Sequence, residues 1–338
     1  MTPVHHPDRS EIDRAVALLR AGELVGMPTE TVYGLAADAA NPEAVAKIFA
    51  AKGRPADHPL IVHLAHDDLV TRWARDIPEV AWDLMETFWP GPLTLILKRT
   101  ALAPDAVTGG QDTVGLRVPG HPVALQLLQA FADAGGEGLA APSANRFGRI
   151  SPTEAAHVRD ELGDRVPLVL DGGPCQVGIE STILDLSRFD DVGPVLLRPG
   201  HITPEQLALV LGQAPQLPNA AANAPRASGT LDAHYAPRTP MKMVAPERLL
   251  DYLNVIRHRG SRCAVIAHSQ PVHAGMPHHW RMLPMDANGY AHDLYAALRD
   301  ADASGAEVIV VEAIPSGPAW SAVADRLRRA LCGAGVSE

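Results

Sequence analysis

Short apolar runs alternate with helical patterns along the first two hundred residues, and this alternation limits the fold more than any other feature of the chain. Asn41 and Pro42 have the residue types of a helix start, with Asn41 as the cap and Pro42 in the first turn. Val45, Ile48 and Lys52 then follow on one face at helical spacing. Strand-like runs stand on both sides of this helix, so the pattern predicts an α/β domain.

Further strands and helices are predicted by the same reading. Several predicted strands follow one another with no helix between them, which favours a mixed sheet over a purely parallel one. Strands are predicted at residues 24–27, 60–64, 93–97, 113–118, 138–141, 166–170, 181–186 and 195–197, and helices at 83–89, 122–134 and 153–162.

The chain has 338 residues, more than one ordinary hydrophobic core accommodates, and its composition changes near the middle. Ala, Pro and Asn dominate residues 212–240, which indicates an extended linker. Strands and helices alternate again after it, at 248–257, 263–267, 290–301, 308–312 and 319–331. We therefore predict a larger, catalytic α/β domain over 1–211, a linker over 212–240 and a smaller α/β domain over 241–338.

Charge and cysteine content limit the classes of function. The formal net charge of −10 argues against a surface that coats nucleic acid, although it permits a local basic pocket. Cys175, Cys263 and Cys332 are far apart and odd in number, which fits a reducing compartment better than a disulfide framework. No apolar run is long enough to span a bilayer and no secretion signal is recognised, so we expect a cytoplasmic protein with no membrane partner.

Five polar motifs could carry chemistry, although the familiar nucleotide-binding motifs are missing from the sequence. They are PTETVYGL at 28–35, KGRPADHPLIVH at 52–63, TVGLRVPGHP at 113–122, APSANRFGRISPT at 141–153, and the pair GIESTILDL and LLRPG around 178–200. On spacing alone the first is a polar turn, and the second fits a basic helix end that complements the helix dipole. Its prolines would hold Lys52 and Arg54 rigidly toward an anion such as a phosphate.

Arg117 and His63 are the residues for which burial would matter most. Arg117 alternates with apolar residues in a strand and needs an anionic partner if it is buried, whereas exposure on an edge strand is an equally open alternative. His63 lies in a strand and could be an ordinary core histidine. Ser151 could bind an anion in a loop or simply cap the helix that follows. Together the motifs supply Lys52, Arg54, Arg117 and Arg198 with many hydroxyls at strand ends, as a site for a polyanion and a small zwitterion would need.

The order PTETVYGL, KGRPADHPLIVH, APSAN…SPT, EST and LRPG resembles the YrdC-like family, and the linker with its second domain resembles the two-domain form of that family. The motifs cover roughly residues 10–210, the SGTLDAHYAP segment and, more loosely, the C-terminal domain. The resemblance implies an open twisted α/β sheet followed by a Rossmann-like domain. It implies a nucleotidyltransferase that makes threonylcarbamoyl-AMP and pyrophosphate from L-threonine, bicarbonate and ATP. A partner transferase machinery would then modify an adenosine of tRNA.

The resemblance also assigns residues to the substrates. Lys52, Arg54 and Arg117 would carry catalysis through positioning and charge neutralisation, with no covalent enzyme intermediate. Mg²⁺ would arrive with ATP rather than in a protein cage. Threonine would contact Thr31, His63, Arg117, Ala141 and Ser181, and ATP would contact Lys52, Arg54, His58, Thr113, Ser143, Asn145, Ser151, Arg198 and Tyr235.

Two positions depart from the family pattern. His58 stands where asparagine is usual, and its imidazole could still donate a hydrogen bond to a phosphate. Asp232 stands in the linker where a basic residue is expected. Three other functions remain open at this stage. They are a carbamoyltransferase on the same domain, which lacks support because its zinc-finger-like cysteines are missing, a double-stranded-RNA-binding module without chemistry, and a protein whose polar motifs are only turns and caps.

Overall fold

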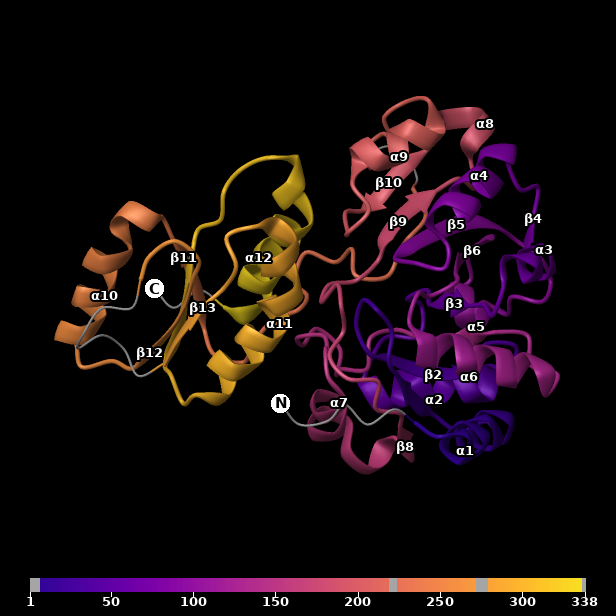
Figure 1. The fold of residues 1–338 in the computed structure, drawn as a ribbon, viewed down its shortest axis with the longest axis horizontal. Helices are drawn as coiled ribbons and strands as arrows, with labels where there is room; N and C mark the ends of the chain where they lie inside the picture. The colour runs from indigo at the N-terminus through magenta and orange to yellow at the C-terminus, as the bar shows by residue number, and fades with distance from the viewer. Residues whose placement is uncertain (1–6, 219–223, 272–278, 336–338) are drawn as a thin grey trace. The chain divides into compact units, whose positions relative to one another are not determined.

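The computed structural model describes residues 7–218, 224–271 and 279–335, and the chain divides into two compact units (Figure 1). The first unit comprises Met1–Phe147 and Pro152–Thr230, and the second comprises Gly148–Ser151 and Leu231–Glu338. Residues 219–223 of the predicted linker lie outside the described residues. Within the described part of the chain, no helix is both long enough and apolar enough to cross a membrane.

The first unit is built on a ten-stranded mixed sheet with the order β10-β9-β5-β6-β3-β7-β2-β1-β8, and β4 pairs with β5 outside that path. Strand β5 runs antiparallel to β6 and parallel to β9, so the predicted mixed sheet is confirmed. The strands are β1 (Val25–Met27), β2 (Gly34–Asp38), β3 (Ile61–His63), β4 (Ala74–Arg75), β5 (Leu93–Arg99), β6 (Thr113–Arg117), β7 (Leu139–Ala140), β8 (Leu168–Val169), β9 (Thr182–Asp185) and β10 (Val195–Arg198).

The helices of the first unit begin largely where their capping residues predict. Asn41 Oδ1 accepts hydrogen bonds from the backbone N–H groups of Glu43 and Ala44 at 3.0 and 3.3 Å, and the helix that follows ends at Lys52. The α-helices are α1 (Arg9–Arg20), α2 (Pro42–Lys52), α3 (Val70–Trp73), α4 (Glu79–Phe88), α5 (Asp105–Thr108), α6 (Pro122–Asp133), α7 (Ala155–Leu162), α8 (Phe189–Val192) and α9 (Pro204–Leu211), and 3₁₀ turns lie at Asp67–Leu69 and Gly163–Arg165.

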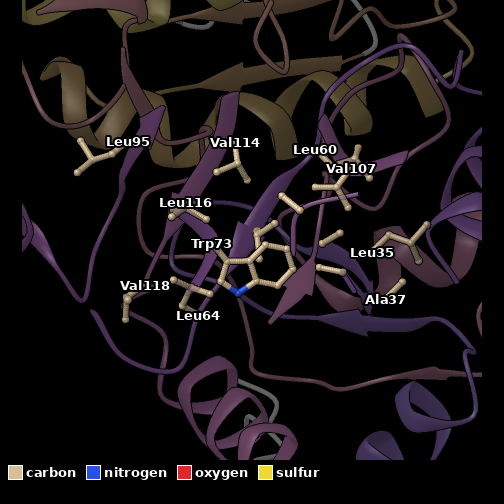
Figure 2. Close-up of a cluster of buried hydrophobic side chains, with 14 of the residues drawn as sticks. Leu35, Ala37, Leu60, Leu64, Trp73, Leu95, Val107, Val114, Leu116 and Val118 are labelled. Carbon is tan, nitrogen blue, oxygen red and sulfur yellow. The ribbon is translucent and has the colours of Figure 1, made fainter. Parts of the chain in front are cut away.

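Alternate residues of the central strands face a hydrophobic core that surrounds the buried indole of Trp73 (Figure 2). Leu64, Leu95 and Leu116 lie on this side of the sheet, together with helix α2. The Trp73 Nε1–H donates to the carbonyl of Glu137 at 3.0 Å, so the one polar atom of the ring is satisfied. Successive strand residues point to opposite faces of the sheet. The residues that alternate with these leucines along each strand therefore face away from this core.

A second core lies on the other side of strands β1, β2 and β7. Helices α1 and α6 cover it with residues such as Ile12, Leu19 and Leu127. Strand β2 contributes Ala36 to this core and Leu35 to the first one, because its two faces are both buried. The sheet is therefore covered by helices on both faces near β2. The face of β3, β5 and β6 opposite the Trp73 core carries His63, Thr94 and Arg117 as well as the apolar Ile61 and Ile96.

The second unit contains a four-stranded parallel sheet with the order β11-β14-β12-β13. Helix α10 lies on one face of this sheet, and α11 and α12 lie on the other, which is the Rossmann-like arrangement that we expected (Figure 1). Its elements are β11 (Met241–Val244), α10 (Leu249–His258), β12 (Cys263–Ala267), β13 (His279–Met282), α11 (Ala287–Ala303), β14 (Val308–Glu312) and α12 (Ser321–Ala334), with 3₁₀ turns at Pro246–Arg248 and Pro318–Trp320.

Candidate functional site

Strands β3 and β6 place His63 and Arg117 side by side on the face of the sheet opposite the Trp73 core. The two strands are parallel, and His63 is the direct register partner of Arg117. Both residues are buried, with 3% of their surface exposed. Since β6 lies between β5 and β3, Arg117 is in an interior strand, and exposure on an edge strand is excluded.

The guanidinium of Arg117 is held by three different groups. Its Nε donates to the carbonyl of Gly91 at 3.1 Å, and its Nη1 donates to Thr31 Oγ1 at 3.0 Å. Its Nη2 forms an ion pair with Glu30 Oε1 at 2.5 Å. Sequence reasoning required an anionic partner for a buried Arg117 but did not assign Glu30, although Glu30 stands next to Thr31 in PTETVYGL.

Gly91 can serve as a partner of Arg117 because the chain is tightly folded around it. A Cβ atom at Gly91 would lie 2.3 Å from the carbonyl oxygen of Phe88, which no other residue type could tolerate without a backbone shift. No sequence pattern singled out this glycine. Its carbonyl accepts from Arg117 because the fold brings the loop that precedes β5 beside the end of β6.

His63 is a neutral imidazole at physiological pH. Burial, followed by the positive charge of Arg117, lowers the pKa of His63 from 6.5 to about 3. Its Nδ1 has no hydrogen-bond partner among the described residues. Buried polar groups are normally hydrogen-bonded, so this nitrogen is a candidate for a ligand contact.

Ser181 connects two groups of predicted site residues. Its hydroxyl lies 2.8 Å from Thr94 Oγ1, and Thr94 is on β5, the strand between β6 and β9. Arg198 donates to the Ser181 carbonyl through Nε at 3.0 Å and through Nη2 at 2.8 Å, and Nη2 also reaches the hydroxyl at 3.1 Å. A Cβ at Gly200 would lie 2.4 Å from the backbone nitrogen of Thr182, so the glycine of the LRPG motif permits this close approach.

Lys52 holds the APSAN loop. Its Nζ donates to the carbonyls of Ser143 and Asn145, both at 2.5 Å, and its own carbonyl accepts from the N–H of Phe147 at 2.9 Å. The side chain is buried, and burial together with the nearby charge of Arg54 lowers the pKa of Lys52 well below its usual value. The contacts of Lys52 therefore position the backbone of a loop that contains two of the predicted ATP ligands.

Arg54 and Arg198 both contact Ser228. Arg54 Nη2 donates to the carbonyl of Pro59 at 2.9 Å and to Ser228 Oγ at 3.4 Å, and Arg198 Nη1 donates to the Ser228 carbonyl at 2.8 Å. The neighbouring Ala227 packs in one hydrophobic cluster with Ile96 of β5 and with apolar residues of β9 and β10. The segment around Ser228, which follows helix α9, thus contacts two of the four cationic side chains that the sequence motifs supply.

The remaining predicted residues of the first unit lie around these groups. Thr113 begins β6, two strand positions from Gly115 and four from Arg117, and so shares their face. Ala141 is buried and donates its backbone N–H to the carbonyl of Ile61 at 3.1 Å. His58 packs edge-on against the ring of Phe147, and partial burial with the charge of Arg54 lowers its pKa, so it offers a neutral imidazole.

Ser151 and Tyr235 belong to the second unit. The carbonyl of Ser151 accepts a hydrogen bond from Arg299 Nε of helix α11 at 3.4 Å. Ser151 does not cap the following helix, because the N-cap of α7 is Glu154. The ring of Tyr235 is buried, 5.3 Å from the guanidinium carbon of Arg326.

Helix α12 holds the linker segment that precedes Tyr235. Arg329 donates to the carbonyl of Leu231, and its own carbonyl accepts from the N–H of His234 at 3.2 Å. Arg328 lies 3.4 Å from Asp232. The acidic residue at this linker position therefore pairs with a basic residue of α12 at the exposed surface.

The structure thus brings Thr31, His63 and Arg117 together, and it links Ser181 to Arg198 and Lys52 to the APSAN loop. It adds Glu30 and Gly91, which sequence reasoning did not include. Throughout the residues that the structure describes, no three His, Cys, Asp or Glu side chains are grouped so that they could hold a metal ion.

Comparisons with known proteins agree on one family. A family model described as "Telomere recombination" matches residues 17–200, and one described as "Threonylcarbamoyl-AMP synthase, C-terminal domain" matches residues 202–331. The threonylcarbamoyl-AMP synthase of Bacillus subtilis is 41% identical over 96% of this chain and 93% of its own length. That of Pyrococcus abyssi is 38% identical over 94% of this chain and 92% of its own length.

A solved structure extends this likeness to the whole fold. The crystal structure of P. abyssi Sua5 complexed with L-threonine has a TM-score of 0.89 and 35% sequence identity, and the match covers 98% of this chain and 97% of that one. The sequence matches and the structural match point to the same family. The chain belongs to the family of threonylcarbamoyl-AMP synthases, enzymes of the nucleotidyltransferase type.

Proposed function

We propose that this chain synthesises threonylcarbamoyl-AMP and pyrophosphate from L-threonine, bicarbonate and ATP. The observation that carries the proposal is the buried Arg117, whose guanidinium contacts Thr31 and stands beside the neutral His63. A buried guanidinium suits the carboxylate of an amino acid, and the hydroxyl and imidazole suit its small polar side chain. The relative from P. abyssi was crystallised with L-threonine, which supports this assignment.

The nucleotide is assigned to the other polar residues on the same unit. Lys52, Arg54 and Arg198 are the cations proposed for its phosphates, and the loop that Lys52 contacts supplies Ser143 and Asn145. Thr113 and His58 are proposed to bind ATP as neutral hydrogen-bonding groups. Ser151 and Tyr235 are proposed ATP ligands on the strength of the family motif.

The proposed chemistry needs positioning and charge neutralisation rather than a nucleophilic side chain. The α-ammonium group of threonine first loses a proton to solvent, and the resulting amine attacks bicarbonate to form a carbamate and release water. The carbamate oxygen then attacks the α-phosphorus of ATP and displaces pyrophosphate. Arg117 orients the amino acid, while Lys52 and Arg54, together with Arg198, offset the phosphate charge. Mg²⁺ would enter as part of the nucleotide substrate, with the phosphates as its main ligands.

The product is proposed to serve the threonylcarbamoyl modification of tRNA in the cytoplasm. A threonylcarbamoyl transferase would consume it, and we propose no stable contact between this chain and nucleic acid. The formal net charge of −10 supports that view, because stable RNA binding requires an extended cationic surface.

Pyrophosphate release tests the proposal. It should require ATP, threonine and bicarbonate together, and omission of any one should abolish it. If pyrophosphate release continues without threonine, then ATP reacts with an acceptor other than threonine. Salt-sensitive retention of double-stranded RNA without ATP turnover would favour a binding module instead.

A further inference from the structure

Glu30 and Arg117 form a buried ion pair whose acidic member has a free oxygen. The side chains of Arg117 and Glu30 are 4% and 9% exposed, and their closest atoms are 2.5 Å apart. Glu30 Oε1 accepts this bond, whereas Glu30 Oε2 is buried and has no hydrogen-bond partner within residues 7–218, 224–271 and 279–335. A buried carboxylate oxygen without a donor is costly, so its presence beside the main charged group of the site calls for a ligand.

Arg117 also retains hydrogen-bonding capacity. A guanidinium has five N–H donors. One on Nε binds the Gly91 carbonyl, one on Nη1 binds Thr31 and one on Nη2 binds Glu30, which leaves one N–H on each terminal nitrogen. Among the described residues, the pair therefore has one carboxylate oxygen without a donor and two N–H groups without an acceptor.

We propose that Glu30 binds the α-ammonium group of the amino-acid substrate through Oε2 while Arg117 binds the α-carboxylate. This inference rests on the proposed function, and it adds a second charged ligand for the same substrate. A zwitterion carries one cation and one anion, and the Glu30–Arg117 pair presents the complementary charges. The pair keeps the buried site neutral before and after the substrate enters, which reduces the cost of transferring a charged amino acid out of water.

The backbone around Glu30 is fixed well enough for such a role. The carbonyl of Glu30 accepts from the N–H of Val177 at 2.7 Å, and Thr29 Oγ1 accepts from the N–H groups of Thr31 and Val32, each at 3.2 Å. These contacts fix the backbone on both sides of Glu30, and the ion pair with Arg117 orients its carboxylate.

A different role for Glu30 has the opposite consequence. If Glu30 only neutralised Arg117 and gave way to the substrate carboxylate, it would compete with threonine. Replacement of Glu30 by Gln would then leave threonine binding unchanged or make it tighter. If Glu30 binds the ammonium group, the same replacement should instead weaken threonine binding.

The test compares threonine with 3-hydroxybutyrate, which keeps the carboxylate and the hydroxyl but lacks the ammonium group. Calorimetry in the absence of ATP and bicarbonate measures both affinities in the unmodified chain, in Glu30→Gln and in Glu43→Gln. Glu43 is an exposed carboxylate in the first turn of α2 and serves as the matched control. We expect the unmodified chain and Glu43→Gln to prefer threonine by about tenfold or more, as loss of one charge-assisted hydrogen bond implies.

In Glu30→Gln, threonine binding should weaken by about tenfold while binding of 3-hydroxybutyrate persists, so the preference is lost. Persistent binding of the analogue also reports that the site is folded. An unchanged preference, or tighter threonine binding, in Glu30→Gln would overturn the inference. Equal affinity of the unmodified chain for the two ligands would overturn it without any variant. No threonine binding by the unmodified chain would contradict the proposed function itself.

Discussion

Arg198 donates hydrogen bonds to both the carbonyl and the hydroxyl of Ser181, so a residue assigned to the nucleotide directly supports a residue assigned to threonine. Ser181 also bonds to Thr94 on the neighbouring strand β5. The two proposed substrate sites are therefore connected through one serine rather than built independently. A substitution at Ser181 can remove the hydroxyl and leave the carbonyl, so it separates the contribution of the hydroxyl from that of the carbonyl.

Ser181→Ala should impair threonine use more than ATP use. The variant loses the hydroxyl, but the carbonyl still accepts from Arg198 Nε and Nη2, so the position of Arg198 is retained. Loss of one neutral hydrogen bond of about 1 kcal/mol predicts an increase of roughly fivefold in the KM for threonine. Steady-state kinetics with each substrate varied in turn measures both constants. A larger rise in the KM for ATP than for threonine would contradict the assignment.

Arg117→Met should destabilise the fold as well as abolish activity, because it leaves Glu30 charged and buried. Removal of one member of a buried ion pair costs about 3–5 kcal/mol. The double variant Glu30→Gln with Arg117→Met should recover much of that free energy of unfolding and remain inactive. Urea denaturation with an activity assay separates the two effects. A double variant no more stable than Arg117→Met would show that the pair is not the source of the loss.

His63 should make stability fall as the solution becomes more acidic. The pKa of His63 is about 3 in the folded chain and 6.5 in the unfolded chain, so the unfolded state binds more protons between these values. Its stabilising contribution is fully present above pH 6.5 and is lost as pH falls toward 3. Between pH 7 and pH 5 the loss is about 2 kcal/mol.

His63→Gln removes that titration. Denaturation midpoints at pH 7 and pH 5 should therefore differ less in His63→Gln than in the unmodified chain. His66→Gln, in which an exposed histidine three residues beyond the end of β3 is replaced, is the matched control and should behave like the unmodified chain. The same pH dependence in His63→Gln would mean that other groups control acid stability.

Arg329→Ala should affect the linker and not the threonine site. The guanidinium of Arg329 binds the Leu231 carbonyl and Asp325, and it lies in helix α12, which also holds the segment before Tyr235. If Tyr235 contacts the nucleotide, as the family motif implies, release of this segment should raise the KM for ATP several-fold. Calorimetric threonine binding without ATP should stay unchanged. Unaltered kinetics would leave the linker without a role in nucleotide use.

Much of the fold could be predicted because its signals are local. Asn41 with Pro42 marks the start of α2, and alternation around Leu116 marks β6. Helix α1 was missed although Asp8 and Glu11 form a capping box, a signal that the sequence carries. Strand β2 was missed for a different reason. Its sequence GLAAD is buried on both faces and shows no alternation.

The site was predicted from the order of its motifs, and the parts that depend on long-range contacts were not. Thr31 and Arg117 were identified individually, but their hydrogen bond joins residues that are far apart in the sequence. The partner of Arg117 could not be chosen among the chain's many carboxylates until the hairpin of β1 and β2 placed Glu30 beside it. Gly91 escaped notice because a carbonyl acceptor leaves no mark in the residue type.

The most direct test of the central claim follows carbon from bicarbonate into the product. The chain is incubated with ATP, Mg²⁺, L-threonine and ¹³C-labelled bicarbonate, and the nucleotide products are analysed by mass spectrometry. We predict a nucleotide with the mass of threonylcarbamoyl-AMP that gains one mass unit with the label. It should be lost when threonine is replaced by 3-hydroxybutyrate. Formation of AMP and pyrophosphate with no labelled nucleotide, under conditions that keep the labile product intact, would contradict the proposed function.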